Sequence, residues 1–490
     1  MRVINLLKQD GCFGLVATNT IAQGDTREIG LDQVVKIGEI YRSVPSRPWS
    51  GTAALEVAYV WAKKGGWEGK YFINEKEVDG ITSYLSVSSN SMGTPEKLKA
   101  NESKSFQGSN VVGMGFVLEP EEAKALITKN SKNKDVLFPY LNGSDVNSNY
   151  DQSPSRWVIN FFDWALSPEH DDPKKPKGAP YATDYPDCLE IVERLVKPER
   201  ITKPPINHFN KTIARDWWLY GGPRKELYEA IAQCDRVLVC ARVSKMLIFS
   251  FVPNEYVFNE KLVVFPDSNS VYFSLLQSDI HVHWAWQYSS TMRDAGINYS
   301  PTDVLETFPF PTLTPETEKE LETIGEKYYN HRQQIMQTTQ LGLTKTYNRF
   351  HDPNDTAADI QQLRELHIQM DYAVMKAYGW LDLVIGDGEL VMGNGELVMG
   401  NGTITNPQSP ITNHQSAITN PLNHNFHQTK QGLRFTISET ARRDILDRLL
   451  ALNHARYAEE VKAGVGKEKG KRKKEKFVDK RQMNHLGKIN

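Results

Sequence analysis

The spacing of apolar residues near the N-terminus predicts a helix, a strand and a hairpin in succession. Residues 3–9 have helical spacing, and the apolar run CFGLVAT (12–18) is typical of a strand covered on both faces, followed by a polar loop that reaches Arg27. Apolar and polar residues alternate in 37–44 and again in 54–65, with the turn-rich sequence SRPWSG between them. We therefore expect an antiparallel hairpin that closes the last third of an α/β domain.

The pattern changes in the middle of the chain. Between residues 136 and 311, short aromatic and β-branched runs such as RVLVCARV, KLVVFP and VYFSLLQ are separated by Gly, Pro, Asn and Asp. Helical patterns occur at 118–127, 185–197 and 224–233. The combination predicts a strand-rich α+β domain.

Helical spacing dominates after Pro311. It predicts helices over 315–340 and 355–378, and a third that begins after a capping box at Thr436–Glu439 and ends near Val461. The apolar side of this last helix consists of Ile445, Leu446, Leu449 and Leu450.

A low-complexity segment separates the second and third of these helices. GELVMGN occurs twice, at 388–394 and 395–401, and Ile-Thr-Asn recurs with the same seven-residue period at 404, 411 and 418. Gly, Asn and Pro disfavour a coiled coil, so we interpret the segment as an expanded DNA repeat translated into a flexible loop. The basic end from Lys467 is expected to be disordered.

The composition is that of a soluble protein of 490 residues, with 39% hydrophobic and 24% charged residues. The sequence has no run of about 18 apolar residues and no signal-peptide pattern, so we expect a cytoplasmic location. Residues 462–490 contain eleven Lys/Arg and three Asp/Glu, a balance of +8, which leaves −10 on the rest of the chain. A mildly acidic body argues against unspecific coating of nucleic acid but permits a local basic groove.

Most candidate catalytic or metal-binding motifs fail. Cys12, Cys188, Cys234 and Cys240 have neither zinc-ligand nor C-x-x-C spacing, which indicates reduced core residues and no metal. The two histidines of HVHWAW (281–286) alternate within an aromatic run and are interpreted as packing residues. The sequence has no Walker motif, no G-x-S-x-G elbow and no G-x-G-x-x-G after a strand.

Lys203-Pro204-Pro205-Ile206 resembles the tetrapeptide with which amino-methyltransferases hold the amine of a target base. In that motif the first side chain must accept a proton from the amine. Lysine only donates, and the fourth residue is not aromatic, so we predict that this sequence has no catalytic role.

Basic, hydroxyl and aromatic residues at predicted strand ends are better candidates for contacts with DNA. A cation and a large ring on the hairpin loop suit phosphate contact and base stacking, although a tryptophan packed on its own sheet is the alternative. The other candidates supply groups that bind phosphates or base edges. The predicted DNA-binding residues are Arg47, Trp49, Arg156, Arg242, Ser244, Lys245, Thr291 and Arg293.

Several long segments resemble one protein family. They include TNTIAQGDTREIGL, SRPWSGTAALEVAYVW, DQSPSRWVINFFDW, SPTDVLETFPFP and GLRFTISETARRDILDRLL. These are similar to the C-terminal half of type IIG and type IIL fused restriction–modification enzymes, which combine a nuclease, an adenine-specific N6 DNA methyltransferase and a target-recognition domain in one chain. The resemblance extends over most of residues 1–380 and 424–465.

The resemblance implies an α/β plus α+β architecture with defined boundaries. Residues 1–85 would be the C-terminal part of a class I, Rossmann-like methyltransferase domain, with 14–27 its fifth strand and following loop. Residues 86–311 would contain a linker and the target-recognition domain. The remaining parts would be a helical region (312–380), the repeat insertion (381–423), a C-terminal helical segment (424–465) and the basic tail (466–490).

The chain departs from the family in its catalytic motifs. Intact members bind S-adenosylmethionine at a glycine-rich turn and hold the flipped adenine with Asn-Pro-Pro-Tyr/Phe, and neither sequence occurs here. We therefore expect no catalytic or cofactor-binding residues and no methyl transfer by this chain alone.

These expectations leave three hypotheses about function. The chain is the sequence-recognition part of an adenine-N6 methyltransferase, with double-stranded DNA as a partner and a separate polypeptide supplying the missing half. Alternatively, it is a stand-alone DNA-binding specificity subunit. A third interpretation is the inactive remnant of a truncated restriction–modification gene.

Overall fold

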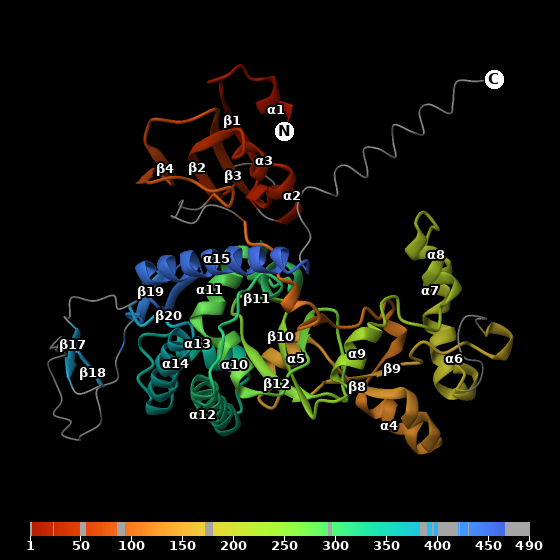
Figure 1. The fold of residues 1–490 in the computed structure, drawn as a ribbon. Coiled ribbons are helices and arrows are strands. Elements are labelled where there is room, and N and C mark those ends of the chain that lie inside the picture. The colour runs from red at the N-terminus through yellow and green to blue at the C-terminus, as the bar shows by residue number, and fades with distance from the viewer. Residues whose placement is uncertain are drawn as a thin grey trace, which may run out of the picture.

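The computed structural model combines six sheets with fifteen α-helices among its described residues (Figure 1). The expected mixture of α/β and α+β architecture is confirmed. The boundaries between domains stay a prediction. None of the described helices is both long and apolar enough to cross a membrane. The structure describes residues 2–22, 24–49, 55–85, 94–171, 180–292, 296–382, 390–393, 396–399, 420, 422–429 and 431–465.

The N-terminal part is a five-stranded sheet with three short helices. Its strand order is β1-β3-β2-β4-β5, and β2 and β3 form the predicted antiparallel hairpin. A small core of its own lies beneath the sheet. The elements are α1 (Arg2–Leu6), β1 (Cys12–Thr18), α2 (Gly24–Ile29), α3 (Leu31–Val34), β2 (Gly38–Pro48), β3 (Glu56–Lys64), β4 (Tyr71–Ile73) and β5 (Lys76–Val78).

Two expectations about the N-terminal part were wrong. Strand β1 is not covered on both faces but lies at the edge of the sheet, where Phe13 and Leu15 face the core and Val16 is 50% exposed. An unbroken apolar run does not tell which face is covered. The polar loop after it is helical, because Asn19–Ala22 forms a 3-10 turn and α2 follows.

The middle of the chain forms three further sheets. Their strand orders are β13-β8-β9-β7, β12-β10-β14-β6 and β11-β16-β15. The elements are β6 (Phe106–Gln107), β7 (Val117–Leu118), α4 (Pro120–Lys129), β8 (Leu137–Leu141), α5 (Gly143–Ser148), β9 (Arg156–Ile159), α6 (Pro186–Leu195), α7 (Lys197–Ile201), α8 (His208–Arg215), α9 (Lys225–Ile231), β10 (Arg236–Ala241), β11 (Val243–Ser244), β12 (Phe249–Pro253), β13 (Val257–Phe258), β14 (Leu262–Phe265), α10 (Ser270–Gln277), α11 (Asp279–Tyr288), β15 (Ser290–Met292) and β16 (Gly296–Asn298).

The segments VYFSLLQ and HVHWAW are helices rather than strand-like runs. They lie in α10 and α11, where seven of the eight residues of α10 are buried. A helix that is buried on all sides has no polar stripe, so its sequence resembles that of a buried strand. The expectation of a strand over VYFSLLQ was wrong for that reason.

The C-terminal helices complete the largest core of the protein. This core joins residues of β10, β12 and β14 to α10, α11, α12, α14 and α15. The elements are α12 (Pro315–Thr339), α13 (Leu343–Phe350), α14 (Ala358–Ala377), β17 (Leu390–Gly393), β18 (Glu396–Met399), β19 (Asn425–Thr429), β20 (Gly432–Thr436) and α15 (Glu439–Lys462). In the repeat insertion, strand β17 of one GELVMGN copy pairs antiparallel with β18 of the next.

Helix α15 begins at Glu439, two residues after the start that a cap at Thr436 would give. Its N-cap is Ser438, whose side chain accepts a hydrogen bond from the Ala441 amide. Thr436 instead donates its hydroxyl proton to Asp279. The predicted apolar side of the helix is buried, as expected. The basic tail lies outside the described residues.

Both ends of the repeat insertion are attached to the helical core. Before the insertion, Asp382 forms a bidentate ion pair with Arg448 of α15, with Nη1–Oδ1 and Nη2–Oδ2 distances of 2.9 and 2.7 Å. After it, His424 Nε2 lies 2.8 Å from Asp371 Oδ2 of α14. Asp382 and His424, the described residues on either side of the repeat, are therefore both held against the helices of the core.

Candidate nucleic-acid interface

One predicted pair of DNA-binding residues lies at the tip of the β2–β3 hairpin. Arg47 is opposite Val57 in the register, and the Trp49 amide donates to the Leu55 carbonyl at 2.9 Å. Both side chains are exposed, Trp49 by 41%. The tip thus presents a cation and an indole ring to solvent, which suits phosphate contact and stacking.

The three-stranded sheet β11-β16-β15 brings two distant predicted segments together. Ser244 pairs with Ile297, and Ile297 pairs with Thr291 on the opposite strand. The close approach requires Gly296, whose φ is +95° and where a Cβ would lie 2.1 Å from the Ser244 carbonyl oxygen. Ser244 and Thr291 therefore lie in one small sheet, and Arg242 and Lys245 flank strand β11.

The predicted side chains of this sheet are not equally available. Lys245 is exposed, and Arg242 is half-buried with a buried Nε that has no hydrogen-bond partner among the described residues. The Ser244 hydroxyl donates to the Met246 carbonyl at 2.6 Å and accepts from the Met246 amide. Lys245 and Arg242 are therefore the stronger candidates for DNA contact. Arg293 lies outside the described residues, and the side chain of Thr291 is not described.

Arg156 belongs to a different sheet. It begins β9, is 43% exposed, and its Nε lies 3.5 Å from the Glu119 carboxylate. A long, exposed ion pair of this kind contributes little to stability, so the guanidinium can exchange it for a phosphate at small cost. Its contact with DNA stays a prediction, as do those of the other predicted residues.

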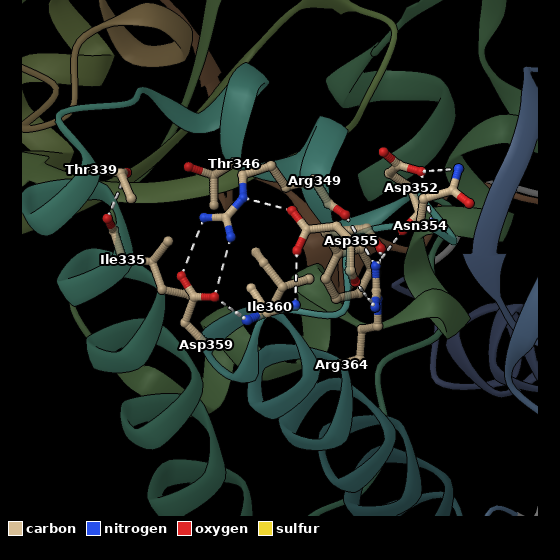
Figure 2. A network of polar contacts seen from close by, with 12 residues as sticks. Ile335, Thr339, Thr346, Arg349, Asp352, Asn354, Asp355, Asp359, Ile360 and Arg364 are labelled. Atoms are coloured by element: carbon tan, nitrogen blue, oxygen red, sulfur yellow. Dashed lines mark hydrogen bonds and ion pairs between the residues drawn. The ribbon is translucent and has the colours of Figure 1, made fainter. Parts of the chain in front are cut away.

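Other basic residues are engaged inside the protein. At the α13–α14 corner (residues 343–364), Arg349 pairs with Asp355 at 2.8 Å and with Asp359 at 3.2 Å. Arg364 donates to four backbone carbonyls in the same corner, those of Arg349, Phe350, Asp352 and Asp355. Figure 2 shows both guanidinium groups inside this network.

A buried cluster of acidic residues and histidines was missed by the sequence analysis. The Asp279 carboxylate accepts from the Thr436 hydroxyl at 2.7 Å, and Asp371 accepts from the Asp279 amide at 2.9 Å. His367 Nε2 lies 3.4 Å from Asp279 and 3.6 Å from Asp371, and these carboxylates raise the pKa of His367 to about 9. No sequence motif links these residues, because they come from three separate elements, α11, α14 and β20.

This cluster could in principle hold a metal ion. Ligand atoms of Asp279, Asp371 and His424 all lie within 4.8 Å of one another. The carboxylate oxygens already accept hydrogen bonds, and His424 Nδ1 contacts the Asn420 side-chain oxygen at 2.9 Å. The bonding is that of an internal ion-pair network that joins α11, α14 and β20.

The remaining sequence candidates are mostly core residues. His281 is buried, with Nδ1 2.9 Å from the Leu276 carbonyl, and burial lowers its pKa to about 3. Trp217 and Trp218 are buried. All four cysteines are free; Cys188 and Cys240 are buried, but Cys12 is exposed on β1, so the expectation of a core position was wrong for it.

The fold resembles that of a known enzyme. The chain is similar to the type IIL restriction–modification enzyme MmeI, which was solved in complex with DNA, with a TM-score of 0.59 and 16% sequence identity. The match covers 75% of this chain and 47% of MmeI, so the chain spans about half the length of that enzyme. At this identity the likeness shows a shared fold. No protein-family model matches the chain, and no curated protein was found to be similar.

Proposed function

We propose that this chain is the DNA sequence-recognition part of a site-specific adenine-N6 DNA methyltransferase of a restriction–modification system. The observation that carries the proposal is the shared fold, over three quarters of the chain, with a restriction–modification enzyme solved on DNA. The long sequence segments that resemble the same class of enzyme support it independently. The exposed residues Lys245, Arg47 and Trp49 supply suitable groups for contact with phosphates and bases.

Methyl transfer by this chain alone is not part of the proposal. Among the described residues, no strand leads through a glycine-rich turn into a helix, so the residues do not fit the S-adenosylmethionine site that the family resemblance implies. A second polypeptide that carries this site would complete the enzyme.

Selection from a randomised duplex pool tests the recognition function. The purified full chain should enrich one short sequence, with an affinity that falls steeply as salt rises. Lys245→Ala should weaken binding to the enriched duplex, whereas Lys319→Ala, an exposed lysine on α12, should not. Binding to all duplexes with equal affinity, or to none, would contradict the proposal and favour the gene remnant.

Methyl transfer is measured separately with labelled S-adenosylmethionine and the enriched duplex. We expect incorporation at the background level for the chain alone. Incorporation above background would contradict the proposal that a second polypeptide carries the methyl-transfer site, but it would not contradict sequence recognition by this chain. Incorporation that appears only after a second polypeptide is added would identify the missing half.

A further inference from the structure

The loop between α7 and α8 exposes an isoleucine. Ile206 is 83% exposed, and Phe209 is 44% exposed. Ile206 ends the Lys-Pro-Pro-Ile sequence, for which no catalytic role was predicted. Figure 1 shows α7 and α8 extending beyond α6, with α8 outermost. We call residues 197–215 the arm. A single exposed aliphatic residue is common on protein surfaces, so a functional role for Ile206 has to be argued from the structure and charge around it.

The tip of the arm is held rigid. Pro204 and Pro205 have fixed φ angles, and the Pro204 carbonyl accepts hydrogen bonds from the Ile206 amide and the Asn210 side chain, both at 2.8 Å. Asn207 caps α8 by accepting from the Asn210 amide at 2.8 Å. Ile206 is therefore presented in a preorganised loop, which lowers the entropy lost on binding.

The base of the arm is anchored in the protein. Arg200 of α7 is fully buried and donates to the carbonyls of Val111, Val112 and Leu219 at 2.8, 2.7 and 2.6 Å. Burial lowers the pKa of its guanidinium to about 10. A buried arginine that satisfies three separate carbonyls fixes the direction of the arm.

The charge around the tip favours an anionic partner. Residues 201–215 include three Lys or Arg residues and no Asp or Glu. Lys203 pairs with Glu199 at 3.0 Å, and Arg215 pairs with Asp216 at 2.6 Å. Lys211 is exposed and forms no ion pair with any described residue. The tip therefore combines a rigid apolar wedge with an available cation.

Duplex DNA matches this combination. Proteins that kink DNA insert isoleucine, leucine or proline between base pairs from the minor groove and neutralise the neighbouring phosphates with basic residues. We propose that Ile206 inserts between two base pairs of the bound duplex, with Lys211 at an adjoining phosphate. This inference rests on the proposed function, since it requires that the chain bind DNA.

Energy transfer between dyes at the two ends of the enriched duplex tests the wedge. Wild-type protein should shorten the end-to-end distance, because a wedge kinks the duplex. Ile206→Ser should abolish the shortening and weaken binding on the order of ten-fold, the lower end of what burial of an isoleucine contributes. Ile201→Ser is the matched control, because Ile201 is 56% exposed but ends α7, before the loop (202–207) that carries Ile206.

The outcomes separate this inference from the proposed function. If the wild type and both variants bind specifically and bend the duplex equally, Ile206 does not act as a wedge, but sequence recognition is unaffected. Absence of binding by the wild type would overturn both. Loss of bending in Ile206→Ser alone, with circular dichroism unchanged, is the result that we expect.

Discussion

The α13–α14 corner and the arm are both rich in basic residues, but their charges face different surroundings. In the corner, Arg349 and Arg364 contact carboxylates and backbone carbonyls of the protein itself. In the arm, Lys211 has no ionic partner among the described residues, and the same arm exposes the apolar side chain of Ile206. The arginines of the corner stabilise the folded protein, whereas Lys211 of the arm is available to bind a ligand.

The number of basic residues does not distinguish these two situations. Arg349 belongs to TYNRFHDPNDTAAD and Lys211 to KPPINHFNKTIAR, and both stretches are polar and rich in turn residues. The difference is that Asp355 and Asp359, which follow the turn after α13, form ion pairs with Arg349. Counting positive charges therefore overestimates the surface that can meet phosphate.

Substitution of Arg364 should have the largest effect on stability. Arg364→Met leaves the carbonyls of Phe350, Asp352 and Asp355 without this donor, so we expect the free energy of unfolding to fall by about 3 kcal/mol. Urea denaturation measures the change. Arg215→Gln, which breaks an exposed ion pair, is the control and should change stability little. Equal losses in both variants would contradict the distinction between the two regions.

Substitution of His367 should have a smaller effect that depends on pH. The pKa of His367 is raised from 6.5 to about 9 in the folded protein, so its stabilising charge is complete below pH 6.5 and is lost as pH rises through 9. The stability advantage of the wild type over His367→Gln should shrink by on the order of 2 kcal/mol across this interval. Thermal or urea unfolding at several pH values measures it, and parallel pH curves would contradict the expectation.

Substitution of Lys211 should leave stability unchanged and alter only binding. Lys211→Gln removes one cation from the tip, so the slope of log affinity against log salt should become shallower by about 0.9. Lys319→Ala, remote from the arm on α12, should leave the slope unchanged. An unchanged slope in Lys211→Gln would show that this lysine meets no phosphate.

Local patterns predicted much of the secondary structure. The β2–β3 hairpin, α4, α6, α12 and α14 follow from alternation, helical spacing and proline at helix starts, because each of these elements has one polar face. The buried helices α10 and α11 have no polar face, and their sequences gave no periodic signal. The N-cap at Ser438 was displaced from Thr436 because a tertiary partner, Asp279, engages the threonine.

The candidate site was predictable only in part. Exposed residues such as Trp49 and Lys245 could be selected by type, because hairpin tips and strand ends face solvent. The pairing that places Ser244 and Thr291 in one sheet depends on long-range contacts. The ion-pair network of Asp279, His367 and Asp371 depends on the packing of α11 against α14, which no single segment encodes.

The two attachments that flank the repeat insertion allow its length to vary. Because Asp382 is held by Arg448 and His424 by Asp371, adding or removing a seven-residue unit leaves both ends of the loop where they are. Doubling the length of a loop costs only about 0.6 kcal/mol in closure entropy. Each unit is also a whole number of codons, so a change in copy number keeps the reading frame. Related genes could thus differ in repeat number and still encode the same folded protein.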